Sequence, residues 1–288
     1  MTGRFSPDKV IDRRDEQDAF AALLAPEDES RVMTIRDKGQ SGKSELLALL
    51  RWRAADSDIP VCLVALDQLR PQTPFTFVRT IERTLRTTGL EFPRFRKMED
   101  ARLQQGLGGI SVEINVREIK DSAKVTGLHA GGDINIDAGG DLDELLRDRA
   151  VDAFVKDLRS DYAGLPMVLL LDAYEQCGEE LAAWLRLFLK KEILDAEAAL
   201  PKLAVVIAGR EVPVDHLRGI LRERFDVLVR PFPSLSPWEP EHVRTLIDMN
   251  GVEPTDTDVN YFHEKLASDW SVGFAIEMLE LFNKQAER

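Results

Sequence analysis

The side chains of Lys43 and Ser44 follow Gly42 directly, at the end of a stretch that reads DKGQSGKS over residues 37–44. An ammonium group and a hydroxyl placed directly after such a glycine hold a phosphate chain and its Mg²⁺ in the pattern GxxxxGK[ST]. Loop N–H groups and a helix N-terminus would add partial positive charge. The pattern departs at its first position, where Asp37 replaces glycine. The alternative is an ordinary strand-to-helix turn with a solvated lysine.

Two acidic residues, Asp172 and Glu175, follow a second buried-strand pattern. An apolar run over residues 167–171 ends at Asp172, and ligands of open α/β sheets bind beyond the carboxyl ends of strands. We therefore predict that Asp172 and Ser44 hold Mg²⁺, with Asp172 on a strand tip adjoining the phosphate loop. Glu175 is the candidate to orient or deprotonate an attacking water. In the alternative, Asp172 caps a helix and Glu175 is an acid of its first turn.

Arg210 follows a third apolar run, residues 203–209. If that strand neighbours the strand ending at Asp172, Arg210 would reach the γ-phosphate region. The alternative is a surface arginine paired with Glu211.

The elements that must position these residues alternate between strand and helix patterns. Short, continuous apolar runs predict strands at residues 31–35, 61–66, 167–171, 203–209 and 225–229. Helical spacing predicts helices at residues 10–24, 44–55, 75–86, 142–158 and 181–194. The predicted fold class is α/β: a P-loop NTPase three-layer sandwich with a mainly parallel sheet.

Two further regions differ from this alternation. Glycines and period-two segments at residues 110–116 and 131–137 predict a β-hairpin-rich insertion over about residues 89–145, with solvated turns favoured over a calcium site. A proline-dense linker over residues 231–240 precedes helical patterns at 241–250, 256–266 and 272–286. We predict a nucleotide-binding domain over residues 1–230, which contains the insertion, and a small helical lid domain over 231–288.

The composition restricts the classes of ligand and location. The 288 residues include 51 acidic and 38 basic side chains, giving a formal net charge of −13. This charge argues against nucleic acid as the main ligand, although a local basic patch could survive it. Two distant cysteines, Cys62 and Cys177, suit a reducing cytoplasm. The apolar runs are too short to span a membrane, and we expect a cytoplasmic protein without membrane attachment.

Taken in order, these stretches resemble the signal-transducing P-loop ATPases with numerous domains, the STAND group, within the broader AAA+-like class. Residues 37–44, 169–175 (LLLDAYE) and 205–211 (VVIAGRE) are similar to the two nucleotide motifs and the strand that ends in a phosphate-sensing arginine. Residues 10–16 are similar to the segment that flanks adenine, with Asp12 in place of the common glycine. Residues 233–247 are similar to the entry into the lid. Residues 271–279 are similar to the lid's Gly-x-Pro stretch, with Ser271 and Gly273 in place of Gly and Pro.

The resemblance implies ATP or ADP with Mg²⁺ as cofactors, and a defined set of site residues. The nucleotide would contact Ile11, Arg13, Gly39, Gln40, Ser41, Gly42, Lys43, Ser44 and Glu45, and hydrolysis would use Lys43, Asp172, Glu175 and Arg210. On spacing alone, residues 10–13 either run beside the base or simply begin an amphipathic helix capped by Asp12.

The resemblance further implies an ATP-binding, slowly hydrolysing switch that drives assembly in signalling or bacterial defence. Family members usually carry an effector or sensor region, which is not among these 288 residues, so we expect either a stand-alone switch with separately encoded partners or a fragment. A homo-oligomer could complete the site with an arginine from a neighbouring subunit, for which Arg218, Arg222 and Arg224 are candidates. The alternatives are a nucleotide-dependent scaffold with little or no hydrolysis and a P-loop small-molecule kinase.

Overall fold

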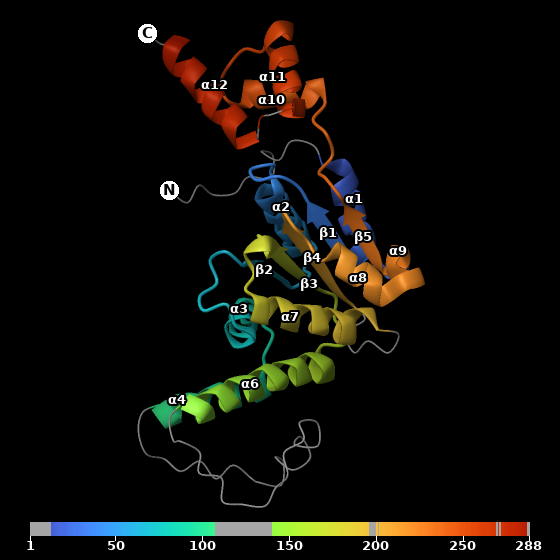
Figure 1. Ribbon diagram of the computed structural model, residues 1–288, viewed down its shortest axis with the longest axis vertical. Coiled ribbons are helices and arrows are strands. Elements are labelled where there is room, and N and C mark those ends of the chain that lie inside the picture. The colour runs from blue at the N-terminus through green and yellow to red at the C-terminus, as the bar shows by residue number, and fades with distance from the viewer. Residues whose placement is uncertain are drawn as a thin grey trace, which may run out of the picture. The chain divides into compact units, whose positions relative to one another are not determined.

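The computed structural model describes residues 13–106, 140–195, 200, 202–268, 270 and 272–286 (Figure 1). The chain divides into two compact units, one formed by residues 1–89 with 162–288 and the other by residues 90–161. Ile11 and the predicted hairpin segments 110–116 and 131–137 lie outside the described residues.

The larger unit is built on a five-stranded sheet whose paired strands are all parallel. Its strands are β1 Val32–Arg36, β2 Val61–Ala65, β3 Met167–Asp172, β4 Leu203–Gly209 and β5 Val229–Phe232, in the order β2-β3-β4-β1-β5. The arrowheads of β1 and β5 in Figure 1 point toward the end of the unit where the C-terminal helices lie. The predicted α/β class with a mainly parallel sheet is confirmed.

Helices cover both faces of this sheet. Helices α1 (Arg14–Leu24) and α2 (Lys43–Asp56) pack on one face, where Phe20 and Leu47 join alternate strand residues such as Val206 in one apolar cluster. The intervening residues of β2, Cys62 and Val64, are also buried, and α3 (Pro74–Arg86) contacts both β2 and α7 (Glu179–Phe188). Every residue of β4 is buried, as expected for a strand covered on both sides.

One predicted strand is wrong. Residues 225–229 begin with a short helix, α9 (Phe225–Leu228), and β5 starts only at Val229. Phe225 and Leu228 are buried while the two residues between them are exposed. That spacing of three is helical rather than extended. Helix α9 follows α8 (Val214–Leu221), and the segment after α7 continues as a π-helix over Leu189–Leu194.

Three helices follow β5: α10 (Pro240–Met249), α11 (Asp256–Ser268) and α12 (Val272–Ala286). They share an apolar core to which Val243, Phe262 and Leu279 contribute. A capping box starts α10: the Glu239 carboxylate accepts from the His242 backbone N–H, and the His242 ring accepts from the Glu239 N–H at 3.1 Å. We call these three helices the lid.

The unit of residues 90–161 contains helices α4 (Pro93–Gly106) and α6 (Gly140–Asp161). The described ends of the insertion are thus helical, and α6 contains the helix predicted over residues 142–158. The β-hairpins at residues 110–116 and 131–137 stay a prediction. Asp157 of α6 is fully buried and accepts backbone N–H bonds from Arg94 at 3.3 Å and Phe95 at 3.0 Å. A cap for the first turn of α4 is thus supplied by a residue more than 60 positions away.

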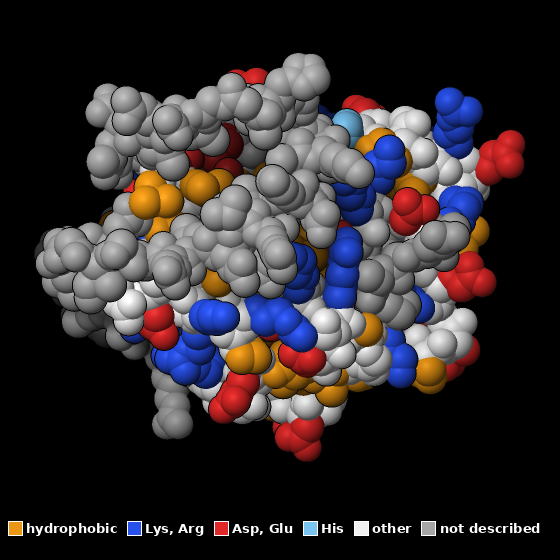
Figure 2. Space-filling model, turned by 90° about the horizontal axis from the view of Figure 1, so that it is seen from below, with side chains coloured by type: hydrophobic (Ala, Val, Ile, Leu, Met, Phe, Trp, Pro, Cys, Tyr) orange, Lys and Arg blue, Asp and Glu red, His pale blue; other side chains and the backbone are white. Residues whose placement is uncertain are grey.

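Charge is unevenly distributed on the surface. Figure 2 shows Lys and Arg side chains close together among acidic ones on one face, despite the net charge of −13. Across the described parts of the chain, the helices are too short or too polar to cross a lipid bilayer.

Candidate functional site

The phosphate-loop residues connect β1 to α2 beyond the carboxyl end of the sheet. Gln40 and Gly42 have positive φ angles of 57° and 96°, and such a backbone is readily adopted by glycine. Gly42 is the N-cap of α2, and its carbonyl accepts the first helical bond from the Leu46 N–H at 2.9 Å. The unpaired N–H groups of the first turn of α2 therefore face the loop, as an anion site requires.

Lys43 turns its ammonium group back into this loop. Its Nζ donates to the Asp37 carbonyl at 2.9 Å, to the Lys38 carbonyl and to the Ser41 hydroxyl at 3.2 Å. Burial lowers the pKa of Lys43, and the nearby carboxylates of Asp37, Glu175 and Asp172 oppose that shift. An incoming phosphate oxygen could replace these loop acceptors without leaving the ammonium unpaired.

Ser44 and Asp172 meet although 128 residues separate them. The Ser44 hydroxyl donates to Asp172 Oδ2 at 2.6 Å, and Oδ1 of the same carboxylate accepts from the Ala173 N–H at 2.8 Å. The prediction that the Asp172 strand adjoins the phosphate-loop strand is wrong, because β4 lies between β3 and β1. Helix α2 closes the gap, since it contacts β4, β3 and β2 on its way across the sheet.

The pair of Ser44 and Asp172 offers a hydroxyl and a carboxylate oxygen within hydrogen-bond distance of each other. Mg²⁺ prefers oxygen ligands and is commonly held by one or two protein groups together with substrate phosphates. The described residues contain no cluster of three His, Cys, Asp or Glu side chains that could hold a metal without such help. The donor set therefore fits Mg²⁺ bound together with a phosphate chain.

Glu175 and Arg210 form an ion pair at the tips of β3 and β4. Ala173, at φ 56°, turns the chain back after Asp172, so that Glu175 lies in a one-turn 3₁₀ helix. Glu175 accepts from the Arg210 backbone N–H at 2.9 Å and from the Arg210 Nε at 3.1 Å. Burial alone would raise the pKa of Glu175, but these hydrogen bonds and the arginine charge lower it. Arg210 thus forms its ion pair with Glu175, whereas the alternative considered from the sequence was an ion pair with Glu211.

Gly209 makes this pair sterically feasible. A Cβ at this position would lie 2.7 Å from Glu175 Oε2 and 2.6 Å from the Glu211 carbonyl. Such distances are shorter than real Cβ contacts, so a larger residue would displace the Glu175 carboxylate.

Most of the predicted site residues line one pocket of about 460 Å³. From the predicted set it includes Arg13, Gly39, Gln40, Ser41, Gly42, Lys43, Ser44, Glu45, Asp172, Glu175 and Arg210. Sequence reasoning did not single out Asp67 and Ala173, nor the lid-side residues Trp238, Leu246, Val272 and Ile276. The available signal for the four lid-side residues was the resemblance of residues 233–247 and 271–279 to lid stretches, within which they fall.

Arg13 lies at the lid-facing wall of this pocket. Its side chain is only 5% exposed, and its guanidinium donates to the Ser236 and Ser41 carbonyls, the latter at 3.3 Å. The guanidinium also lies 5.6 Å from the centre of the Trp238 ring, within cation–π range. The lid-side wall is apolar apart from this guanidinium, and Arg13 joins it to the phosphate loop through the Ser41 carbonyl.

The three arginines suggested as donors to a neighbouring subunit lie elsewhere. Arg218 lies over the Phe225 ring at 4.8 Å, and Arg222 has a positive φ of 48°. The described wall of the pocket includes neither of these nor Arg224. Their role toward a second subunit stays a prediction.

Comparison with known proteins yields distant structural likenesses. No family model and no curated protein matches the chain. Similar solved structures include Cdc6p from Pyrobaculum aerophilum, with 16% identity over 86% of this chain and 50% of that chain and a TM-score of 0.47. A DNA replication initiation factor has 11% identity, coverage of 98% and 64%, and a TM-score of 0.47. The ORC2 protein of Aeropyrum pernix, solved as ADPNP–ADP complexes, has 15% identity, coverage of 85% and 53%, and a TM-score of 0.43.

This chain therefore spans between half and two thirds of the length of these three proteins. With TM-scores below 0.5, the likenesses assign neither a family nor an activity to it.

Proposed function

We propose that the chain is an ATP-binding switch that hydrolyses its nucleotide slowly. The observation that carries this proposal is the 2.6 Å hydrogen bond between Ser44 and Asp172, which joins the start of α2 to the tip of β3. A solvated turn would not require a carboxylate 128 residues away at its hydroxyl. The same pocket also contains a buried lysine and the N-terminus of α2.

In this proposal the two ends of the pocket bind different parts of the nucleotide. The apolar lid-side wall with Trp238 takes the base, and the N–H groups of residues 39–44 take the phosphates. Lys43 exchanges its loop acceptors for phosphate oxygens, and Arg210 adds positive charge at the tip of β4. Ser44 and Asp172 would hold Mg²⁺, which neutralises phosphate charge when bound.

Slow hydrolysis follows from the position of Glu175. A general base must lie within hydrogen-bond reach of the attacking water, but both carboxylate oxygens of Glu175 accept from Arg210. The pair lowers the pKa of Glu175, which makes the carboxylate a weaker proton acceptor for an attacking water.

The test is calorimetric binding of ATP to the purified chain, with Mg²⁺ and with EDTA. Loss of the Lys43 charge removes a contact worth roughly 1.5–3 kcal/mol, so Lys43→Ala should weaken binding about 10- to 150-fold. Lys202→Ala is the matched control, because Lys202 is exposed and precedes the amino end of β4, away from the pocket. Equal ATP affinity in the parent and in Lys43→Ala would refute the assignment.

A nucleotide-dependent scaffold with little or no hydrolysis is the second candidate, and the Glu175–Arg210 pair favours it. Comparing turnover of Glu175→Gln with the parent separates the two functions: a switch loses its turnover, whereas a scaffold has none to lose.

The sequence resemblance supports assembly with separately encoded effector or sensor partners in signalling or bacterial defence. Size analysis of the chain with its candidate partners, in the presence and absence of ATP and Mg²⁺, tests that finer proposal.

A further inference from the structure

The segment between β5 and the lid is held by charged side chains of the sheet domain. The Leu235 N–H donates to Asp37 Oδ2 at 3.3 Å, and the Ser236 N–H donates to Glu16 Oε1 at 2.7 Å. The Ser236 carbonyl accepts from the Arg13 guanidinium. Glu16 and Arg13 are almost completely buried, so these contacts fix the backbone at the point where the lid begins.

Asp37 is the member of this set that belongs to the phosphate loop, and each of its polar groups has a different partner. Its N–H donates to the Gly209 carbonyl at 3.1 Å, and its own carbonyl accepts from Lys43 Nζ at 2.9 Å. Its Oδ1 accepts from the Lys38 N–H at 2.7 Å, while Oδ2 accepts from Leu235. One residue therefore contacts the end of β4, the phosphate-binding lysine and the linker to the lid.

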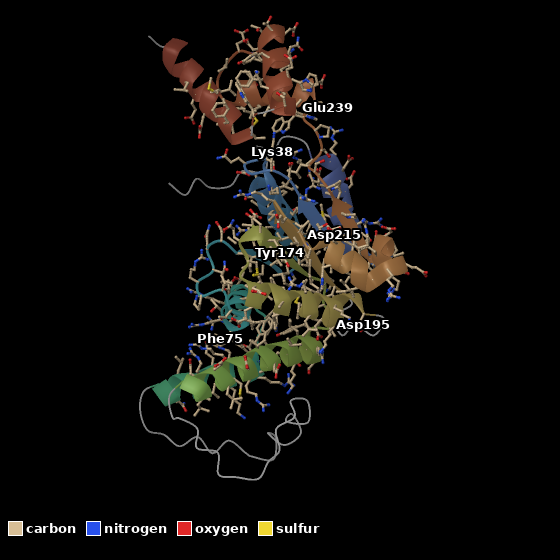
Figure 3. All side chains as sticks on the ribbon, in the orientation of Figure 1. Lys38, Phe75, Tyr174, Asp195, Asp215 and Glu239 are labelled. Atoms are coloured by element: carbon tan, nitrogen blue, oxygen red, sulfur yellow. The ribbon has the colours of Figure 1, made fainter. Side chains whose placement is uncertain are left out.

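The residues that follow Asp37 hold the other side of the lid. Lys38 Nζ donates to the Trp270 carbonyl at 3.1 Å, and the Gln40 carbonyl accepts from the Val272 N–H at 3.1 Å. Figure 3 labels Lys38 between the sheet and the lid helices. The loop thus contacts both the entry to α10 and the start of α12.

A purely local role for Asp37 would leave part of this geometry unexplained. The bond from the Lys38 N–H stabilises the loop by itself, as short polar side chains commonly do. The second carboxylate oxygen, however, bonds a residue 198 positions away. The glycine that the pattern GxxxxGK[ST] has at this position could form neither side-chain bond.

We propose that Asp37 is a positioning residue that couples the phosphate loop to the linker of the lid, so that phosphate binding changes how the lid is held. The coupling rests on the proposed nucleotide function. When Lys43 moves from the Asp37 carbonyl to a phosphate oxygen, the Asp37 backbone is released on one side. Its carboxylate then shifts relative to the Leu235 N–H, and the linker follows.

The test is hydrogen–deuterium exchange of the full chain with and without ADP and Mg²⁺, comparing residues 39–44 with residues 234–236, which leave out the base-binding Trp238. In the parent we expect nucleotide to alter exchange in both segments. In Asp37→Gly, which restores the residue of the pattern, residues 39–44 should still be protected while residues 234–236 should no longer respond. Asp37→Asn keeps one acceptor oxygen and should give an intermediate response. Asp56→Asn, which removes an exposed acid at the end of α2, is the matched control.

Each outcome has one meaning. A parent-like response of residues 234–236 in Asp37→Gly overturns the coupling and leaves the nucleotide function standing. If neither ADP nor ATP protects residues 39–44 of the parent, the nucleotide function fails, and the coupling fails with it.

A second test measures how the negative charge of Asp37 affects the affinity for ADP. Asp37 places a carboxylate beside the phosphate site, so Asp37→Asn should bind ADP roughly two- to tenfold more tightly, the size expected for one screened like charge several ångströms away. Weaker binding by Asp37→Asn would instead count against a purely positioning role.

Discussion

At the scale of single residues, the Glu175–Arg210 pair sets the charge state of the candidate base. The pair lies at the strand tips, where Arg210 is 62% exposed and Glu175 is 15% exposed. Water screens the arginine, so the pair contributes little to global stability, on the order of 0–1 kcal/mol. Its main effect is to keep Glu175 ionised and to fix the direction of its carboxylate.

We predict that Arg210→Ala raises the pKa of Glu175, because the burial that opposes ionisation remains while the arginine is lost. Glu175 has a lowered pKa in the folded chain, so its small contribution to stability is present above the unfolded pKa and is lost as the pH falls through the folded value. The Arg210 variant should lose that contribution. A ¹³C NMR titration of the Glu175 carboxyl measures the shift.

The control for this titration is Arg230→Ala. Arg230 pairs with Asp28 at 3.2 Å and helps to lower the pKa of that residue. This variant should raise the pKa of Asp28 and leave Glu175 unchanged. An unaltered Glu175 titration in Arg210→Ala would show that the ion pair does not control the base.

At the scale of elements, the cap that Asp157 provides for α4 makes the two helices of the smaller unit interdependent. Asp157→Ala leaves the Arg94 and Phe95 N–H groups without their buried acceptor, and it also removes the 2.9 Å ion pair with Arg94. We expect a loss of about 1–3 kcal/mol and faster hydrogen exchange over residues 93–106. Asp161→Asn is the control, since Asp161 is 39% exposed and its pair with Arg94 is longer, at 3.3 Å. Equal exchange in both variants would contradict the capping role.

The pattern of apolar residues in the sequence predicted those strands that are buried on both faces of the sheet. Continuous apolar runs identified β2, β3 and β4, because strands covered on both faces have no polar side. The same rule failed at residues 225–229, where an apolar run hides a helical turn buried at Phe225 and Leu228. Helix α4 was not predicted, and its first turn is capped by Asp157, a residue more than 60 positions away.

The site residues also divide into those that the local sequence predicts and those whose position depends on tertiary structure. The phosphate loop and the two strand-tip acids are visible in the sequence because each lies beside a recognisable strand. Trp238 and Leu246 lie in a stretch that resembles the entry into the lid, but that they line the pocket depends on how the lid is held. Asp37 was visible as a departure from the pattern, but its contact with Leu235 depends on tertiary structure alone.

At the scale of the whole molecule, nucleotide binding should stabilise the unit that contains the pocket. A ligand at 100 times its Kd stabilises the folded state by about 2.7 kcal/mol, and for a chain of this size that corresponds to a rise in Tm of roughly 5–10 °C. We predict this shift for ATP with Mg²⁺ by scanning calorimetry, a smaller shift with EDTA, and roughly a tenth to a half of the parent's shift for Lys43→Ala at the same ATP concentration. The same Tm with and without ATP in the parent would contradict nucleotide binding.

The strand order has a consequence for the growing chain on the ribosome. β1 pairs with β4 and β5, while β2 and β3 pair elsewhere. During synthesis, β1, which leads into the phosphate loop, therefore cannot pair with its neighbouring strands until residues 203–232 have left the ribosome. A truncated chain that stops at residue 200 would contain Lys43, Ser44, Asp172 and Glu175, yet β1 would have no partner strand to fix its loop.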